Sequence, residues 1–262
     1  MFEGEVYLAG LLLAALPLPA LVWLVSLVKG DVSIVDSLWS LLLLALCLTY
    51  YLAFDYGTQR GVIVLLLVAV WALRLSVYIT WRNWGKPEDA RYQAMREKHG
   101  SQFAVTSLFT VFLLQGVLAW IISLPLLAAT TGSIPLNVLD LLAILLVLFG
   151  ILFEAVADAQ LAAFKAIPDN RGQVMDTGLW RFTRHPNYFG EACVWWGFFL
   201  FGLAAGGWWS VLSPVLMTFL LLRVSGVSLL EKDIVERRPA YRDYIERTNA
   251  FIPGPAGQRT AR

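Results

Sequence analysis

The chain has 262 residues, of which 58% are hydrophobic and 15% are charged, and its formal net charge is +1. Soluble domains carry about 45–50% apolar and about 25% charged residues, so this composition argues against a soluble globular protein. The near-zero charge and the lack of a basic stripe give no sign of a nucleic-acid partner. With two cysteines in apolar blocks and two histidines, no metal site is expected.

The apolar residues form seven blocks, each long enough to cross the hydrocarbon core of a bilayer, which takes roughly 20 helical residues. In chain order the blocks are 6–28, 34–54, 61–81, 104–128, 137–160, 188–205 and 208–230. The fifth is expected to continue as a helix to about Phe164. Only the turn residues 204–207 separate the last two, which predicts an antiparallel hairpin. We therefore predict an all-α polytopic protein with seven transmembrane helices in a single integral membrane domain.

Basic residues indicate how these helices are oriented. They gather after the third and fifth blocks and in the tail, whereas the opposite side of the membrane would carry Arg60 alone. The positive-inside rule then places the N-terminus outside and the C-terminus in the cytoplasm. No internal repeat is visible, so the inverted-repeat signature of many transporters is missing.

Three polar residues stand in the apolar blocks of the N-terminal half. Asp36 lies near the start of the second block, and Arg74 and Tyr78 lie one turn apart in the third. One interpretation is a buried Asp36–Arg74 ion pair that locks two helices together. The other is a cavity lined by an acid and a phenol, in which a protonated Asp36 donates a hydrogen bond to a substrate carbonyl.

A second group of polar residues lies on the fifth block. Glu154 and Asp158 are four residues apart and share one helical face. They could be solvated at a helix end, or they could accept hydrogen bonds from ribose hydroxyls or an amide. A charged residue inside a membrane helix needs a partner or a role, and Arg223 in the seventh block is subject to the same argument.

The densest polar signal runs from Asp176 to Glu191. Arg181 and Arg184 offer guanidinium forks that suit phosphate, and Pro186 can begin the sixth helix. Asn187 and Glu191 then face the same way on that helix. The alternative interpretation is an ordinary basic loop at the membrane surface. Neither GxGxxG nor GxxxxGK[ST] is present, so a Rossmann or P-loop nucleotide site is not supported.

Three runs of sequence resemble a known superfamily. Leu179-Trp-Arg-Phe-Thr-Arg-His-Pro-Asn-Tyr-Phe-Gly-Glu191 resembles the C-terminal signature of the membrane steroid 5α-reductases. Asp31-Val-Ser-Ile-Val-Asp-Ser-Leu-Trp39 and Glu88-Asp-Ala-Arg-Tyr92 are similar to runs of the bacterial branch of that family. The three runs occur in the family's order, so the resemblance covers most of the chain.

The resemblance implies seven transmembrane helices, with an apolar substrate cavity in residues 1–128 and an NADPH site in residues 129–262. In the steroid enzymes a glutamate on the second helix and a tyrosine on the third bind the substrate carbonyl. The nearest acid here is Asp36, and the third-helix match stays open among Trp71, Arg74 and Tyr78. The implied catalytic residues are Asp36, Tyr78 and Arg74. The implied cofactor-binding residues are Glu154, Asp158, Lys165, Arg171, Trp180, Arg184, His185, Asn187, Tyr188, Glu191, Arg223, Glu231, Tyr241 and Tyr244.

The expected reaction is NADPH-dependent reduction of the carbon–carbon double bond of an apolar enone, with a 3-oxo-Δ4 steroid as the first choice. The expected setting is a bacterial inner membrane, with the cofactor site facing the cytoplasm, an apolar lipid or steroid as substrate and no obligate protein partner. The main alternative is a membrane methyltransferase that uses S-adenosylmethionine, because isoprenylcysteine carboxyl methyltransferases share the Arg-His-Pro run and a tail like Tyr241-Arg-Asp-Tyr244. A transporter or sensor is the third possibility.

Overall fold

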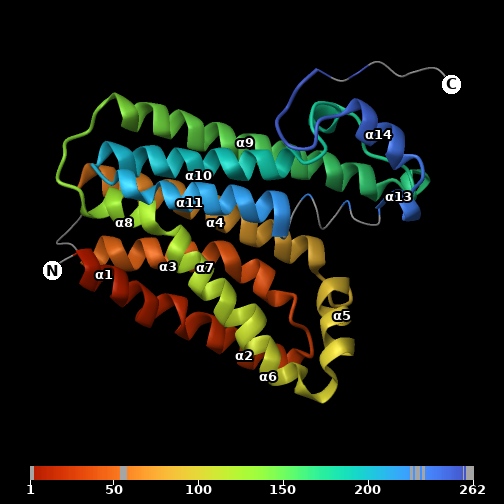
Figure 1. The fold of residues 1–262 in the computed structure, drawn as a ribbon, viewed down its shortest axis with the longest axis horizontal. Coiled ribbons are helices and arrows are strands. Elements are labelled where there is room, and N and C mark those ends of the chain that lie inside the picture. The colour runs from red at the N-terminus through yellow and green to blue at the C-terminus, as the bar shows by residue number, and fades with distance from the viewer. Residues whose placement is uncertain are drawn as a thin grey trace. The chain divides into compact units, whose positions relative to one another are not determined.

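The computed structural model describes residues 3–53, 58–224, 227, 231, 234–255 and 257, and within them every regular element is a helix (Figure 1). The chain divides into two compact units. Unit 1 comprises Met1–Asp140 and Phe199–Ser213, and unit 2 comprises Leu141–Phe198 and Pro214–Arg262. The predicted all-α fold is confirmed for the described residues.

Among the described residues, five helical stretches are long and apolar enough to cross a bilayer, as in a multi-pass membrane protein. Their bounds are Glu3–Lys29, Ile34–Ala53, Gln59–Asn83, Ala90–Ile122 and Val138–Ala166. The predicted blocks 34–54 and 61–81 agree with the second and third to within a few residues. The total of seven and the orientation of the chain stay predictions.

The described parts of the predicted sixth and seventh spans are also helical. Helix α10 (Pro186–Ala204) begins at the proline expected to start it. After a turn at Gly206, which has a φ of 90°, the chain continues as η6 (Trp208–Val211), α11 (Leu212–Phe219) and η7 (Leu220–Val224). The Trp196 indole donates to Thr218 Oγ1 at 3.3 Å, as the predicted hairpin requires. Of residues 225–230, only Val227 is described.

Unit 1 begins with α1 (Glu3–Gly10), the π-helical η1 (Leu11–Ala15) and α2 (Pro17–Lys29). Helix α2 ends at Gly30, whose φ of 67° is a left-handed conformation that glycine adopts without strain. Helix α3 (Ile34–Ala53) and helix α4 (Gln59–Asn83) follow. The Thr58 hydroxyl caps α4 by accepting from the Gly61 amide.

The predicted block 104–128 overlaps a longer helical stretch that begins at Ala90 and ends at Ile122. It is built from α5 (Ala90–His99), η2 (Gly100–Gln102), α6 (Phe103–Ser107), η3 (Leu108–Leu113) and α7 (Leu114–Ile122), and α8 (Leu124–Thr131) follows it. Because the first turns of α5 are polar, the apolar blocks of the sequence do not predict that this helical stretch begins at Ala90. Asp89 caps the N-terminus of α5, because its side chain accepts a hydrogen bond from the Arg91 amide.

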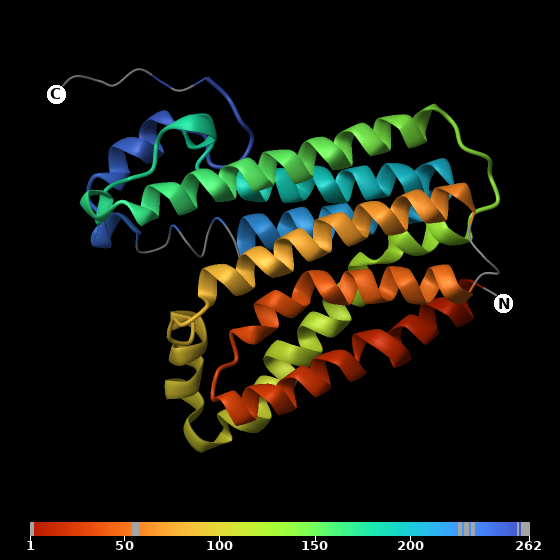
Figure 2. The same cartoon turned by 180° about the vertical axis from the view of Figure 1, so that it is seen from behind.

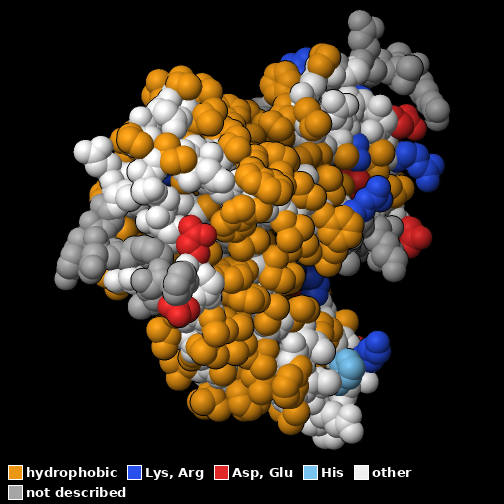
Figure 3. All heavy atoms as spheres, turned by 60° about the vertical axis from the view of Figure 1, so that its left-hand side comes forward, with side chains coloured by type: hydrophobic (Ala, Val, Ile, Leu, Met, Phe, Trp, Pro, Cys, Tyr) orange, Lys and Arg blue, Asp and Glu red, His pale blue; other side chains and the backbone are white. Residues whose placement is uncertain are grey.

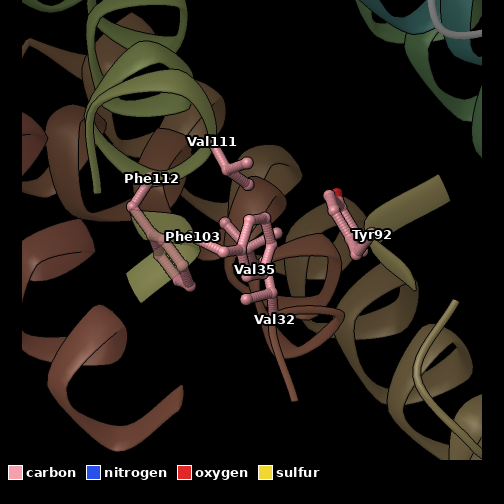
Figure 4. Packing of buried hydrophobic residues seen from close by; sticks show 6 residues of the cluster. All are labelled: Val32, Val35, Tyr92, Phe103, Val111 and Phe112. Carbon is pink, nitrogen blue, oxygen red and sulfur yellow. The ribbon is translucent and has the colours of Figure 1, made fainter. Parts of the chain in front are cut away.

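The core of unit 1 includes a cluster of buried apolar side chains that joins α3, α5, α6 and η3 (Figure 4). It consists of Val32, Val35, Tyr92, Phe103, Val111 and Phe112. Other apolar side chains point outward, such as Val28, which is 89% exposed. Figure 3 shows a face of the molecule on which hydrophobic side chains predominate, which is the surface that lipid tails would cover.

Unit 2 is built around α9 (Val138–Ala166) and α10, which lie side by side in Figures 1 and 2. Glycines allow the close approach: a Cβ atom on Gly150 would lie 2.6 Å from the Gly190 carbonyl oxygen. The remaining elements are short: η4 (Pro168–Asn170), η5 (Gly178–Arg181), α13 (Ile234–Arg237) and α14 (Tyr241–Arg247). The signature run therefore bridges η5 and the start of α10.

Candidate functional site

The first candidate region surrounds Asp36, in the first turn of α3. One carboxylate oxygen of Asp36, Oδ1, accepts from the Tyr92 hydroxyl at 2.7 Å. The other, Oδ2, accepts from Arg91 Nη2 at 2.8 Å. Arg91 and Tyr92 are adjacent on α5, so an acid of an apolar helix is bound by a guanidinium and a phenol from one neighbouring segment.

The same segment makes further contacts with the corner between α2 and α3. The Asp89 amide donates to Ser33 Oγ at 2.7 Å, and its carboxylate accepts from Arg91 Nε at 2.9 Å. The Glu88 carboxylate accepts from the Val32 amide at 2.9 Å. We call the residues Val32, Ser33, Asp36, Glu88, Asp89, Arg91 and Tyr92 the Asp36 network. Two of the three runs that carry the family resemblance thus meet one another in space.

Two acids of the Asp36 network lie in the loop before α5. Burial acts to raise the pKa of the Glu88 carboxyl, but hydrogen bonds from Arg96 and Val32 outweigh it and hold that pKa below its usual value. The pKa of Asp89 is likewise lowered, because hydrogen bonds from the Arg91 side chain and amide outweigh the effect of burial. Both groups are therefore carboxylates at neutral pH, as their arginine partners require.

The predicted catalytic residues of α4 occupy other surroundings. Arg74 and Tyr78 are half-buried, and the Tyr78 ring lies 6.1 Å from the Trp81 ring. The interpretation of an Asp36–Arg74 ion pair is wrong, because the ion-pair partner of Asp36 is Arg91. The phenol bound to Asp36 is Tyr92. Sequence reasoning had singled out the run that contains Tyr92 without assigning this residue a role.

The second candidate region lies in unit 2 around Arg184. The Arg184 guanidinium donates to both carboxylate oxygens of Glu231, from Nε at 2.7 Å and from Nη2 at 2.9 Å. Its Nη1 donates to the backbone oxygens of Ile245 and Thr248, at 3.1 and 2.5 Å. The side chain of Arg184 is 9% exposed. This arginine therefore ties the signature loop to Glu231 and to the end of α14.

His185 and three aromatic residues complete this region. His185 Nε2 lies 3.0 Å from Glu231 Oε1, and its ring stacks on that of Tyr188 with an interplanar angle of 3°. The Tyr244 hydroxyl donates to the Trp180 carbonyl oxygen. We call the residues Trp180, Arg184, His185, Glu231 and Tyr244 the Arg184 cluster. It brings together five residues that the resemblance assigned to the cofactor.

Electrostatics in the Arg184 cluster favour a charged Glu231. Burial acts to raise the pKa of the Glu231 carboxyl, but hydrogen bonds from His185 and Arg184 and the Arg184 charge lower it to about 2. Tyr241 packs edge-on against the Tyr244 ring at 5.2 Å. Burial raises the pKa of Tyr241 to about 12, so its hydroxyl stays protonated at neutral pH.

Three other predicted cofactor residues are buried acids of apolar helices. Glu154, Asp158 and Glu191 are 4%, 4% and 5% exposed. Glu191 Oε1 accepts from the Trp195 indole at 3.3 Å. The Asn187 amide nitrogen lies 3.4 Å from Asp158 Oδ1, whereas its amide oxygen is buried and has no hydrogen-bond partner among the described residues.

Exposed basic residues make up the remainder of the predicted set. Lys165, Arg171 and Arg223 are all exposed. Arg181, which precedes the buried Arg184 by three positions, is also exposed. Among the described residues no group of three His, Cys, Asp or Glu side chains could hold a metal ion.

A family model described as "Protein of unknown function (DUF1295)" matches residues 22–248. The chain belongs to the DUF1295 family. The matched range contains every residue of the Asp36 network and of the Arg184 cluster. The family is associated with steroid 5α-reductase-like membrane proteins, which agrees with the resemblance that the three runs carry.

A relative from Schizosaccharomyces pombe, "Uncharacterized protein C594.04c", is 29% identical over 284 residues. The alignment covers 96% of this DUF1295 chain and 81% of the relative. No solved structure matches the chain.

Proposed function

We propose that this DUF1295 protein is an NADPH-dependent reductase that saturates the carbon–carbon double bond of an apolar enone. The preferred substrate is a 3-oxo-Δ4 steroid or a lipid enone of similar shape, taken from a bacterial inner membrane, with the cofactor bound on the cytoplasmic side. The proposal draws on the three sequence runs and on the apolar helices. The observation that carries it is the buried amide of Asn187.

The Asn187 side chain fits a nicotinamide carboxamide. Its Oδ1 is buried without a partner among the described residues, and an unsatisfied buried acceptor costs about 1–3 kcal/mol. A ligand that presents an N–H group to this oxygen would recover that cost. The carboxamide of nicotinamide has both an N–H donor and a carbonyl acceptor, so it can pair with Asn187 and with its neighbours on α10.

The polar residues of unit 2 divide into two sets in this proposal. Arg171, Arg181 and Lys165 are exposed, so they can pair with the phosphates, including the 2′-phosphate that distinguishes NADPH. Arg184 donates to Glu231 and to two backbone oxygens, so it positions the loop. When bound, the cofactor supplies a hydride to the β-carbon of the enone.

Unit 1 supplies the surroundings for the substrate in this proposal. Negative charge grows on the ketone oxygen as the β-carbon gains a hydride, so hydrogen-bond donors fixed next to that oxygen lower the barrier. The Asp36 network is polar and adjoins the apolar cluster of Val35 and Phe103, which suits a molecule with an apolar body and one polar oxygen. Packed apolar side chains also limit the access of bulk water to the reacting atoms.

A methyltransferase that uses S-adenosylmethionine is the second candidate, and one observation favours it. Glu154, Asp158 and Glu191 put three buried carboxyl groups into unit 2, and buried negative charge suits the cationic sulfonium and amino groups of that cofactor. The contact of the Tyr244 tail with Trp180 would serve either cofactor equally well.

Cofactor binding to the purified protein separates the two candidates. A ligand that binds only the folded state raises the apparent melting temperature, so we expect NADPH to raise it and S-adenosylmethionine to leave it unchanged. Asn187→Ala should weaken NADPH binding about tenfold, whereas Asn83→Ala at the end of α4 should leave it unchanged. A stabilisation by S-adenosylmethionine alone would make the methyltransferase the better proposal.

A further inference from the structure

Arg91 and Arg96 of α5 both leave Nη1 without a hydrogen bond to a described residue, and of the two Arg91 is the one that binds Asp36. Arg91 donates to Asp36 from Nη2 and to Asp89 from Nε and Nη2, and its bonds to described residues do not involve Nη1. The side chain is 41% exposed. We infer that Arg91 is a catalytic residue, whose Nη1 binds the ketone oxygen of the substrate, and that Asp36 and Asp89 are positioning residues that hold its guanidinium.

The hydrogen-bond inventory of the network leads to this assignment. Asp36 Oδ2 accepts from the Arg91 guanidinium at 2.8 Å and Asp36 Oδ1 accepts from the Tyr92 hydroxyl at 2.7 Å, so both of its oxygens are already in use as acceptors. Tyr92 has one hydroxyl proton and donates it to Asp36. Neither residue has a donor left for a ketone. Arginine stays protonated in proteins and has five N–H donors, so Arg91 can serve its two carboxylates and still bind a ligand oxygen.

The chemistry of the proposed reaction requires a donor of this kind. Hydride from NADPH forms a bond to the β-carbon, the π electrons of the double bond move toward the carbonyl, and the ketone oxygen becomes an enolate oxygen. A fixed guanidinium stabilises this negative charge without transferring a proton. The α-carbon then takes a proton from a water molecule, which leaves as hydroxide, so the double bond gains one hydride and one proton while NADPH becomes NADP⁺.

The surroundings of Arg91 suit an amphipathic ligand. Its guanidinium lies 5.3 Å from the centre of the Tyr92 ring. That ring belongs to the buried apolar cluster, while its hydroxyl, the red atom in Figure 4, reaches Asp36. An apolar enone likewise combines an apolar body with one polar oxygen. The inference names the carbonyl-binding group and rests on the proposed function.

Helix α5 offers a matched control. Arg96 lies on the same helix, is 42% exposed at its side chain and is paired with a carboxylate, that of Glu88. Its Nη2 also donates to the Gly30 carbonyl, and its guanidinium lies over the Phe103 ring at 4.5 Å. Arg96 makes no contact with Asp36. Loss of Arg96 therefore removes a similar ion pair from the same helix without touching the proposed carbonyl site.

The test compares Arg91→Ala, Arg91→Lys and Arg96→Ala in steady-state reduction of a 3-oxo-Δ4 steroid by NADPH. Removing one donor to a developing oxyanion typically lowers kcat by 10²–10³-fold. We expect a loss of about this size for Arg91→Ala, a smaller loss for Arg91→Lys, and kcat within about threefold of wild type for Arg96→Ala. Added guanidinium ion should restore part of the activity of Arg91→Ala and have no such effect on Arg96→Ala.

The outcomes distinguish the inference from the proposed function. If the wild type reduces enones and Arg91→Ala keeps its kcat, the proposed function stands and the assignment of Arg91 is overturned. The assignment is also overturned if Arg91→Ala and Arg96→Ala lose activity equally and guanidinium rescues neither. If the wild type binds no NADPH and reduces no enone, both fail together. NADPH binding by each variant, measured by thermal shift, shows whether unit 2 is intact.

Discussion

The Asp36 network and the Arg184 cluster each hold an arginine against a carboxylate, yet they use it differently. The side chain of Arg184 is 9% exposed, and all three of its nitrogens donate to protein atoms. Arg91 is 41% exposed and leaves Nη1 without a bond to a described residue. A buried arginine with its donors used connects segments of the chain, whereas a half-exposed one with a donor left can also bind a ligand.

The partners of the two arginines also differ in kind. Arg91 binds two side-chain carboxylates, those of Asp89, two residues away, and Asp36, 55 residues away. Arg184 reaches Glu231, 47 residues away, and the Thr248 carbonyl, 64 residues away. Arg184 therefore holds the C-terminal segment in place over the signature loop, and its loss should affect the fold of unit 2 more than any single ligand contact.

Arg184→Ala should give the largest change in stability. Removing one partner of a buried ion pair destabilises a protein by about 3–5 kcal/mol, because the other charge stays buried. We expect a marked fall in the melting temperature of the detergent-purified protein. Arg181→Ala is the control, since this exposed neighbour should change stability by no more than about 0.5 kcal/mol. Equal effects from the two variants would refute the role of Arg184 as a link between segments.

Gly190→Ala should give the next largest effect. A Cβ atom at this position would lie 2.8 Å from the Glu154 backbone nitrogen and from the Gly150 carbonyl oxygen, so α9 and α10 would have to separate. Overpacking of this kind costs about 1–3 kcal/mol. Gly172→Ala tests a loop glycine whose added Cβ meets no atom within 4 Å. That variant reports only the strain of a positive φ, measured by the same thermal melts.

The pH dependence of stability should single out the Arg184 cluster. The Glu231 pKa is about 2 in the folded protein and near 4.5 in the unfolded chain, so its contribution is complete above about pH 4.5 and is lost as the pH falls toward 2. Because Glu231 is partly exposed, solvent screening reduces the contribution to about 1 kcal/mol. Glu231→Gln should flatten the stability profile between these pH values. A variant that loses stability with acid as steeply as the wild type contradicts this assignment.

Glu88→Gln should give the smallest effect. Glu88 pairs with Arg96, whose side chain is 42% exposed, and such half-exposed ion pairs contribute about 0–1 kcal/mol. The loss should shrink further when salt is added, because salt screens exposed charges. A loss as large as that of Arg184→Ala would show that the Asp36 network also holds its segment in place, and would remove the contrast between the two regions.

Much of the fold was predictable because hydropathy is a local property. The second span was expected at 34–54 and is Ile34–Ala53, and the fifth was expected to continue to Phe164 and ends at Ala166. Pro186 begins its helix because a proline fits the first turn, where its missing N–H is not needed. The start of the fourth stretch at Ala90 was not predicted, since its first turns are polar.

The contacts between segments could not be read from local patterns. Charge counting assigned Arg60 to one side of the membrane but gave it no partner, and the structure pairs it with Asp140 at 2.6 Å in a buried ion pair. Local patterns also could not show that Asp36 binds Tyr92, because Tyr92 lies 56 residues further along the chain. Sequence reasoning found the residues of the Arg184 cluster through the family resemblance. It could not show that Glu231 and the backbone oxygens of Ile245 and Thr248 would together accept from the donors of Arg184.

NADPH consumption by the purified protein in lipid nanodiscs, with a 3-oxo-Δ4 steroid present, tests the central claim most directly. The account predicts that NADPH is oxidised only when the enone is added, and that the steroid gains one hydride and one proton across its double bond. A protein that leaves NADPH and a panel of apolar enones unchanged, while it transfers a methyl group from S-adenosylmethionine to a membrane-embedded acceptor, would contradict the account.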